Sequence, residues 1–132
     1  MKHLLDTDTC IYALKRNASV LERLLSRSRS DIAVSVITEA ELRTGAAKSS
    51  TPVKTSHLLE NFLRPLTVVE FTSADATTYA RLRAKLERAG TPIGPLDTLI
   101  AAQAVSRKLV LVTNNQREFG RVPSLRLENW SR

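Results

Sequence analysis

The stretch His3-Leu4-Leu5-Asp6-Thr7-Asp8-Thr9 joins a short apolar run to an abrupt polar end. This pattern is typical of a buried strand that delivers a carboxylate to the edge of a sheet. Burying a carboxylate costs free energy unless a cation or hydrogen-bond donors meet it. Two interpretations therefore stay open for Asp6 and Asp8: they cap the helix that follows, or they help to hold a metal ion.

The composition describes an ordinary globular chain. Its 132 residues, 42% of them hydrophobic and 25% charged, suffice for a single domain spanning 1–132 with a buried core. No apolar run approaches the roughly 20 residues that a membrane-spanning helix needs, and the early acids argue against a secretory signal. The single cysteine, Cys10, excludes an intrachain disulfide and a cysteine-based zinc site. We expect a cytoplasmic protein.

The chain is basic, with 20 Lys and Arg residues against 13 Asp and Glu residues and a net charge of +7. Most of the cations are arginines, whose guanidinium group can bind two phosphate oxygens at once. Basic residues do not gather into a tail, and aromatic residues, at 5%, are too few to indicate stacking on bases. Charge alone leaves nucleic-acid binding and a merely basic surface as equal alternatives.

Short apolar segments alternate along the chain with amphipathic ones. Strands are expected at 4–5, 32–35, 67–71 and 109–112, with a short edge strand within 125–130. Helices are expected at about 7–16, 19–28, 38–49, 53–63, 73–89 and 95–107. Apolar strands that alternate with helices indicate a parallel sheet covered on both faces. The sequence therefore predicts an α/β fold, a three-layer α-β-α sandwich around a mostly parallel sheet of four to five strands.

Several polar side chains should meet at one edge of this sheet, because parallel strands share the edge where ligands bind. Asp6 closes the first strand, Glu41 lies in the first turn of the helix after the second, and Asn115 follows the strand at 109–112. The helix at 95–107 spans roughly 20 Å and the strand after it about 17 Å. A tight turn makes the two antiparallel, so Asp97, near the start of that helix, reaches the same edge.

Each acid also has a simpler structural explanation. Thr38 as N-cap with Glu41 three residues later fits a capping box, and Asp97 in a first helical turn suits the helix dipole. Three carboxylates that meet repel one another, however, and a hard divalent cation such as Mg²⁺ or Mn²⁺ relieves the repulsion. Such sites activate water and neutralise charge on phosphates. The convergence of these segments favours a metal site that acts on nucleic acid.

The chain resembles the PIN-domain ribonucleases of the VapC toxin type over essentially its whole length. The resemblance rests on Leu4-Leu5-Asp6-Thr7, on 35–42 (Ser-Val-Ile-Thr-Glu-Ala-Glu-Leu), on 93–102 (Ile-Gly-Pro-Leu-Asp-Thr-Leu-Ile-Ala-Ala), on 111–115 with Arg117-Glu118-Phe119, and on 125–130. It implies a Mg²⁺-dependent endoribonuclease, with Mn²⁺ as a substitute, that arrests translation by cutting RNA. The RNA is typically a tRNA, often cut in the anticodon loop.

The same resemblance implies a homodimer and a cognate VapB-type antitoxin that occludes the site. It allows larger assemblies of toxin and antitoxin, and it implies that the chain meets DNA only through the antitoxin. By position, the resemblance implies that Asp6 and Asp97 are metal ligands and that Glu41 helps to position the metal, directly or through water. Asn115 stands where many PIN domains have Asp, and Glu118 is the nearest carboxylate that could replace it. Relatives usually read Asp-Thr-Asn where this chain has Asp6-Thr7-Asp8, and we interpret Asp8 as a helix cap.

Two alternatives compete with this interpretation. A phosphatase of the haloacid dehalogenase type also opens with a strand ending in Asp-x-Asp, but it requires Thr or Val in place of Cys10. It also requires a catalytic lysine, and an acidic pair where this chain has Asn114-Asn115. The second alternative is a catalytically inactive PIN module that only binds RNA or a protein. The amide at Asn115 keeps that alternative open.

Overall fold

The computed structural model describes all 132 residues and contains one five-stranded sheet. Its strands are β1 (His3–Leu5), β2 (Ile32–Ser35), β3 (Thr67–Val69), β4 (Val110–Val112) and β5 (Leu127–Glu128). The strand order is β3-β2-β1-β4-β5, and every neighbouring pair is parallel. The strand that carries the opening apolar run therefore lies at the centre of the sheet.

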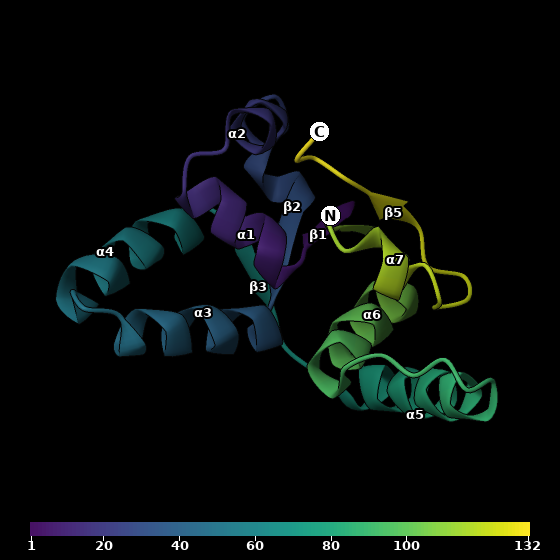
Figure 1. Ribbon diagram of the computed structural model, residues 1–132. Coiled ribbons are helices and arrows are strands. Elements are labelled where there is room, and N and C mark those ends of the chain that lie inside the picture. The colour runs from purple at the N-terminus through teal and green to yellow at the C-terminus, as the bar shows by residue number, and fades with distance from the viewer.

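Seven helices and a 3₁₀ turn (Arg29–Asp31) surround this sheet. The helices are α1 (Thr7–Leu14), α2 (Ala18–Leu25), α3 (Val36–Lys48), α4 (Pro52–Leu63), α5 (Ser73–Arg88), α6 (Pro95–Arg107) and α7 (Gln116–Phe119). In Figure 1, α1 to α4 lie to one side of the sheet and α5 to α7 to the other. None of the helices is long and apolar enough to cross a membrane.

Alternation along the central strands divides the core into two halves. The register places Leu5 of β1 beside Val34 and Val112, and all three pack in the cluster that α1 to α4 cover. The residues that precede them, Leu4, Ala33 and Leu111, point to the opposite face of the sheet and pack with residues of α5 and α6. Because apolar side chains project from both faces of the sheet, helices must cover both faces. The predicted three-layer sandwich is confirmed.

The start of α3 differs from the prediction. Ser35, not Thr38, is the N-cap, and its hydroxyl oxygen accepts a hydrogen bond from the Ile37 backbone N–H at 3.0 Å. The predicted capping box of Thr38 and Glu41 is therefore wrong, because β2 leads directly into the helix three residues earlier. Glu41 consequently lies in the second turn of α3, and Thr38 is a buried helical residue.

The cap of α1 also differs from the prediction. Asp6 is the N-cap, and its Oδ1 accepts a hydrogen bond from the Thr9 backbone N–H at 2.8 Å. Asp8 lies inside the first turn of the helix, so its predicted role as the cap is wrong. No helix was predicted at 116–119, where the structure has α7, a single turn whose N-cap is Asn115.

Candidate active site

A polar cavity of about 220 Å³ opens at the carboxyl edge of the sheet. The residues that line it come from the end of β1, from the first turns of α1 and α6, from the second turn of α3 and from both ends of α7, segments far apart in the sequence. They are Asp6, Thr7, Asp8, Glu41, Asp97, Asn115 and Phe119. The structure thus brings together four of the five site residues predicted from the sequence.

Asp6 is the most deeply set of the acids, with 4% of its surface exposed. Both of its carboxylate oxygens are held: Oδ1 by the Thr9 backbone N–H at 2.8 Å, and Oδ2 by the hydroxyl of Thr113. Burial nevertheless raises the pKa of Asp6 to about 6, because the hydrogen bonds offset only part of the desolvation. The donors fix the carboxylate in place without neutralising its charge.

Asp97 is the third residue of α6, where Pro95 begins the helix without donating a backbone hydrogen bond. Burial is the largest cause that raises the pKa of Asp97 to about 6. The negative charges of Glu118, Glu41, Asp6 and Asp8 raise this pKa further. The carboxylates are therefore close enough to repel one another across the cavity.

No cation of the chain neutralises this group of acids. The salt bridges join other carboxylates to His3, Arg43, Arg83 and Arg107, and none includes a residue that lines the cavity. Unpaired carboxylates that repel one another destabilise a folded chain, so their arrangement favours a function over a purely structural role.

Asn115 and Glu118 form a clasp beside the cavity. The Asn115 side-chain amide donates to Glu118 Oε2 at 2.8 Å, and the Gly94 backbone N–H lies 3.3 Å from Glu118 Oε1. These two bonds lower the pKa of Glu118. Asn115 lines the cavity, whereas Glu118 does not. Glu118 thus links the start of α7 to the loop that precedes Asp97.

Sequence reasoning missed three residues of the site. Thr113 follows β4 at the edge where the acids meet, a position that could have indicated its role. Thr7 and Phe119 belong to two of the quoted motifs, but the motifs did not indicate their roles, which depend on side-chain contacts with residues distant in the sequence. Phe119 is 1% exposed and closes the cavity against the core.

The donor set fits a hard divalent cation bound through a few ligands. No three His, Cys, Asp or Glu side chains converge into a ready-made metal cage. The polar groups of the cavity nevertheless offer oxygen ligands, which Mg²⁺ and Mn²⁺ prefer over nitrogen or sulfur. Because Mg²⁺ usually keeps several waters and binds through one or two carboxylates, Asp6 and Asp97 would suffice as its protein ligands.

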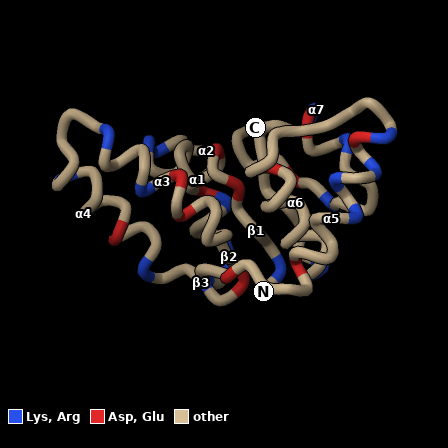
Figure 2. Tube along the Cα trace, turned by 90° about the horizontal axis from the view of Figure 1, so that it is seen from below, with Lys and Arg blue, Asp and Glu red and all other residues tan.

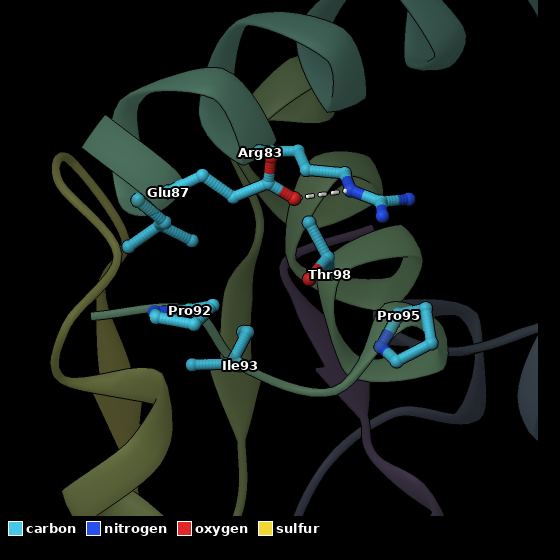
Figure 3. A pocket seen from close by; sticks show the side chains of 7 residues that line it. Arg83, Glu87, Pro92, Ile93, Pro95 and Thr98 are labelled. Atoms are coloured by element: carbon cyan, nitrogen blue, oxygen red, sulfur yellow. Dashed lines mark hydrogen bonds and ion pairs between the residues drawn. The ribbon is translucent and has the colours of Figure 1, made fainter. Parts of the chain in front are cut away.

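A second hollow, of about 160 Å³, lies between α5 and the loop before α6 (Figure 3). Its only charged side chains, Arg83 and Glu87, already bind each other at 2.8 Å across one helical turn. This hollow therefore offers no uncompensated charge and no metal ligands.

Basic residues are frequent on the side of the sheet that α5 to α7 cover (Figure 2). Lys and Arg gather along α5 and near α7 in Figure 2. Arg117, on α7 and two residues after Asn115, is exposed and takes part in no salt bridge. Because α7 borders the cavity through Asn115 and Phe119, an unpaired arginine on this turn is available to a polyanion.

Comparisons with known proteins agree with this geometry. Residues 3–125 match the PIN domain family. A tRNA(fMet)-specific endonuclease VapC from Salmonella typhimurium is 41% identical over 130 residues, 98% of each chain. The structure is similar to that of VapBC2 from Rickettsia felis bound to a promoter DNA fragment, with a TM-score of 0.93, 38% identity and 98% and 99% of the two chains covered. It is also similar to DNA-bound VapBC from Salmonella typhimurium, with a TM-score of 0.94, 42% identity and 98% of each chain covered.

Proposed function

The chain belongs to the PIN domain family, in its VapC group, and from that premise we propose that it is a divalent-metal-dependent endoribonuclease that cuts tRNA. The observation that carries the proposal is the cavity itself. Separate segments deliver Asp6, Glu41 and Asp97 to one place, where no cation of the chain meets them. Fold similarity alone does not imply this activity, but the same fold with these acids in place supports it.

We assign the following roles to the residues of the cavity. Asp6 and Asp97 would hold Mg²⁺, for which Mn²⁺ would substitute, and Glu41 would assist directly or through a water molecule. A divalent ion held there supplies an activated water and neutralises the charge that develops on the phosphate. Thr113 and the Thr9 backbone keep Asp6 in a single orientation, as their hydrogen bonds show.

The fourth polar position belongs to Asn115. Asn115 lines the cavity and Glu118 does not, although the Asn115 amide donates to Glu118 Oε2 and its Oδ1 accepts from the Glu118 backbone N–H at 3.4 Å. We assign Asn115 the task of binding substrate or water at the cavity wall. Glu118 fixes the loop before α6, and through it the position of Asp97.

A tRNA is the substrate class best supported. The net charge of +7 favours a polyanion, and Arg117 is an exposed arginine on α7, the turn that borders the cavity. The relatives from Salmonella typhimurium and Shigella flexneri, 41% and 39% identical, are both tRNA(fMet)-specific endonucleases. We therefore propose tRNA(fMet) as the specific target, so that cleavage inhibits translation.

A VapB-type antitoxin is the proposed protein partner. The similar solved structures from Rickettsia felis and Salmonella typhimurium are VapBC complexes with DNA. We propose that this chain is the toxic component of such a pair, acts as a homodimer, and meets DNA only through its antitoxin. The match to the PIN domain family over residues 3–125 leaves the phosphatase alternative without support.

The direct test is to incubate the purified protein with total tRNA and Mg²⁺ and to sequence the new RNA ends. We expect one dominant cut in tRNA(fMet), which EDTA and the cognate antitoxin both abolish. Asp6→Asn should be inactive. Glu22→Gln, which neutralises an exposed acid on α2, should cut like the parent. Intact tRNA after incubation with folded, Mg²⁺-loaded parent would leave the inactive-module alternative standing, and equal cutting by Asp6→Asn would refute the assigned site.

A further inference from the structure

The Glu41 carboxylate reaches the cavity from the second turn of α3 and has a single hydrogen-bond partner, Thr7. The Thr7 hydroxyl donates to Glu41 Oε1 at 2.6 Å. This separation lies in the range of roughly 2.5–2.7 Å that is typical of a hydrogen bond from a hydroxyl group to a charged carboxylate. Such hydrogen bonds are stronger than those between neutral groups. The other oxygen, Oε2, accepts no hydrogen bond from the protein and is free for a ligand.

Basic neighbours on α3 do not compete for Glu41. Arg43 is the nearest cation in sequence, but its guanidinium binds Glu39 at 2.7 Å and Glu60 at 2.5 Å. These two acids hold Arg43 away from the cavity. A long glutamate side chain with no other partner has several accessible rotamers, and the bond from Thr7 selects one of them.

Thr7 is well placed to direct this carboxylate. It is the first residue of α1, next to the deeply set Asp6, and the starts of α1 and α3 lie side by side in Figure 1. Its hydroxyl also lies 3.2 Å from that of the buried Thr38. Because Thr7 has one hydroxyl hydrogen, the shorter bond to the charged Glu41 takes it.

We infer that Thr7 is a positioning residue whose hydroxyl directs Glu41 into the cavity where Asp6 and Asp97 would hold a divalent ion. This role rests on the proposed metal site, and it adds to that site a residue that acts only through Glu41. The methyl group of Thr7 has no part in it. A serine at this position should therefore suffice, and a valine of nearly the same shape should not.

The test compares Thr7→Val and Thr7→Ser for Mn²⁺ binding by calorimetry and for single-turnover RNA cleavage at varied Mn²⁺ concentration. Thr7→Val should weaken Mn²⁺ binding at least tenfold and raise the half-maximal Mn²⁺ concentration by a similar factor. Thr7→Ser should stay within about threefold of the parent. Thr44→Val removes an exposed hydroxyl from α3, the helix that carries Glu41; it is the matched control and should bind Mn²⁺ like the parent.

A double-mutant cycle separates positioning from a direct role. In a Glu41→Ala background, Thr7→Val should cause no further loss of Mn²⁺ affinity, because Thr7 then has no carboxylate to direct. Parent-like Mn²⁺ binding by Thr7→Val, or equal losses in Thr7→Ser and Thr7→Val, would overturn the inference. If the parent binds Mn²⁺ but cuts no RNA, the proposed function fails, while the Mn²⁺ affinities still decide the role of Thr7. A parent that binds no Mn²⁺ overturns both.

Discussion

Asp6 uses its two oxygens for two purposes. One oxygen caps α1 through the Thr9 backbone, and the other accepts a hydrogen bond from Thr113, while the same carboxylate lines the acidic cavity. Helix cap and metal ligand, which the sequence left as competing interpretations, are therefore compatible. The cap bond fixes the orientation that a metal ligand needs, and burial leaves the charge uncompensated.

Neutralising Asp97 should stabilise the metal-free protein. The pKa of Asp97 rises from 3.8 to about 6 on folding, so this group contributes stability below about pH 4 that is lost as the pH rises through 6. Complete conversion of that shift would give about 3 kcal/mol, and partial solvent exposure reduces it to about 1–2 kcal/mol. In EDTA, Asp97→Asn should raise the free energy of unfolding by that amount at pH 7.5 and by little at pH 4.

Urea unfolding at the two pH values measures this effect. Glu22→Gln, an exposed acid outside the cavity, serves as the control and should change neither value. An Asp97→Asn variant that is no more stable than the parent at pH 7.5 would show that the cavity does not strain the ionised acid.

Single residues also mark the limit of prediction from the sequence. Asp6, Asp97 and Glu41 were expected at one edge because strand ends and helix starts place them there. Thr7 and Thr113 were not, since each acts through a hydroxyl bonded to a residue 34 or 107 positions away. The position of Thr113 at the sheet edge indicates that it lies near the acids, but local patterns do not indicate which residue either hydroxyl bonds.

At the scale of elements, helix starts were the least predictable feature. The sequence favoured Thr38 because a glutamate follows it at capping-box spacing, but β2 ends at Ser35 in extended conformation and α3 begins at once. The helix is therefore longer at its start than predicted. Glu41 still reaches the cavity because the extra residues keep it within the first two turns.

The cap of α3 yields a direct prediction. Ser35→Ala should lower the free energy of unfolding by about 1 kcal/mol, because the partly buried Ile37 N–H loses its acceptor. Thermal or urea unfolding measures the change. Thr44→Ala, an exposed position of the same helix, should cost less, and an unchanged stability of Ser35→Ala would contradict the assignment of the cap.

The turn α7 carries a prediction about RNA. Arg117 is exposed on this turn and has no salt-bridge partner, so Arg117→Ala should weaken tRNA binding several-fold. The slope of log affinity against log salt concentration should become shallower by about 1. Arg64→Ala is the matched control: Arg64 lies just before β3, at the opposite edge of the sheet. Equal losses in the two variants would show that binding depends only on net charge.

At the scale of the whole molecule, the layers were predictable and the strand order was not. Apolar strands that alternate with helices require a parallel sheet covered on both faces, and the clusters above and below β1 confirm it. The order β3-β2-β1-β4-β5 depends instead on which strands pair after the chain crosses over the sheet. The carboxyl edge is common to every order of parallel strands, so the site could be located without knowing the order.

The central claim is that the acidic cavity is a metal-dependent centre for cutting RNA, and single-turnover cleavage of tRNA(fMet) at varied Mg²⁺ concentration tests it most directly. The parent should cut at a rate that saturates with Mg²⁺ and falls to background in EDTA. Asp97→Asn, folded as judged by circular dichroism, should lose at least a hundredfold in rate, about 2.7 kcal/mol of transition-state stabilisation. Undiminished cutting by Asp97→Asn, or cutting by the parent that persists in EDTA, would contradict the claim.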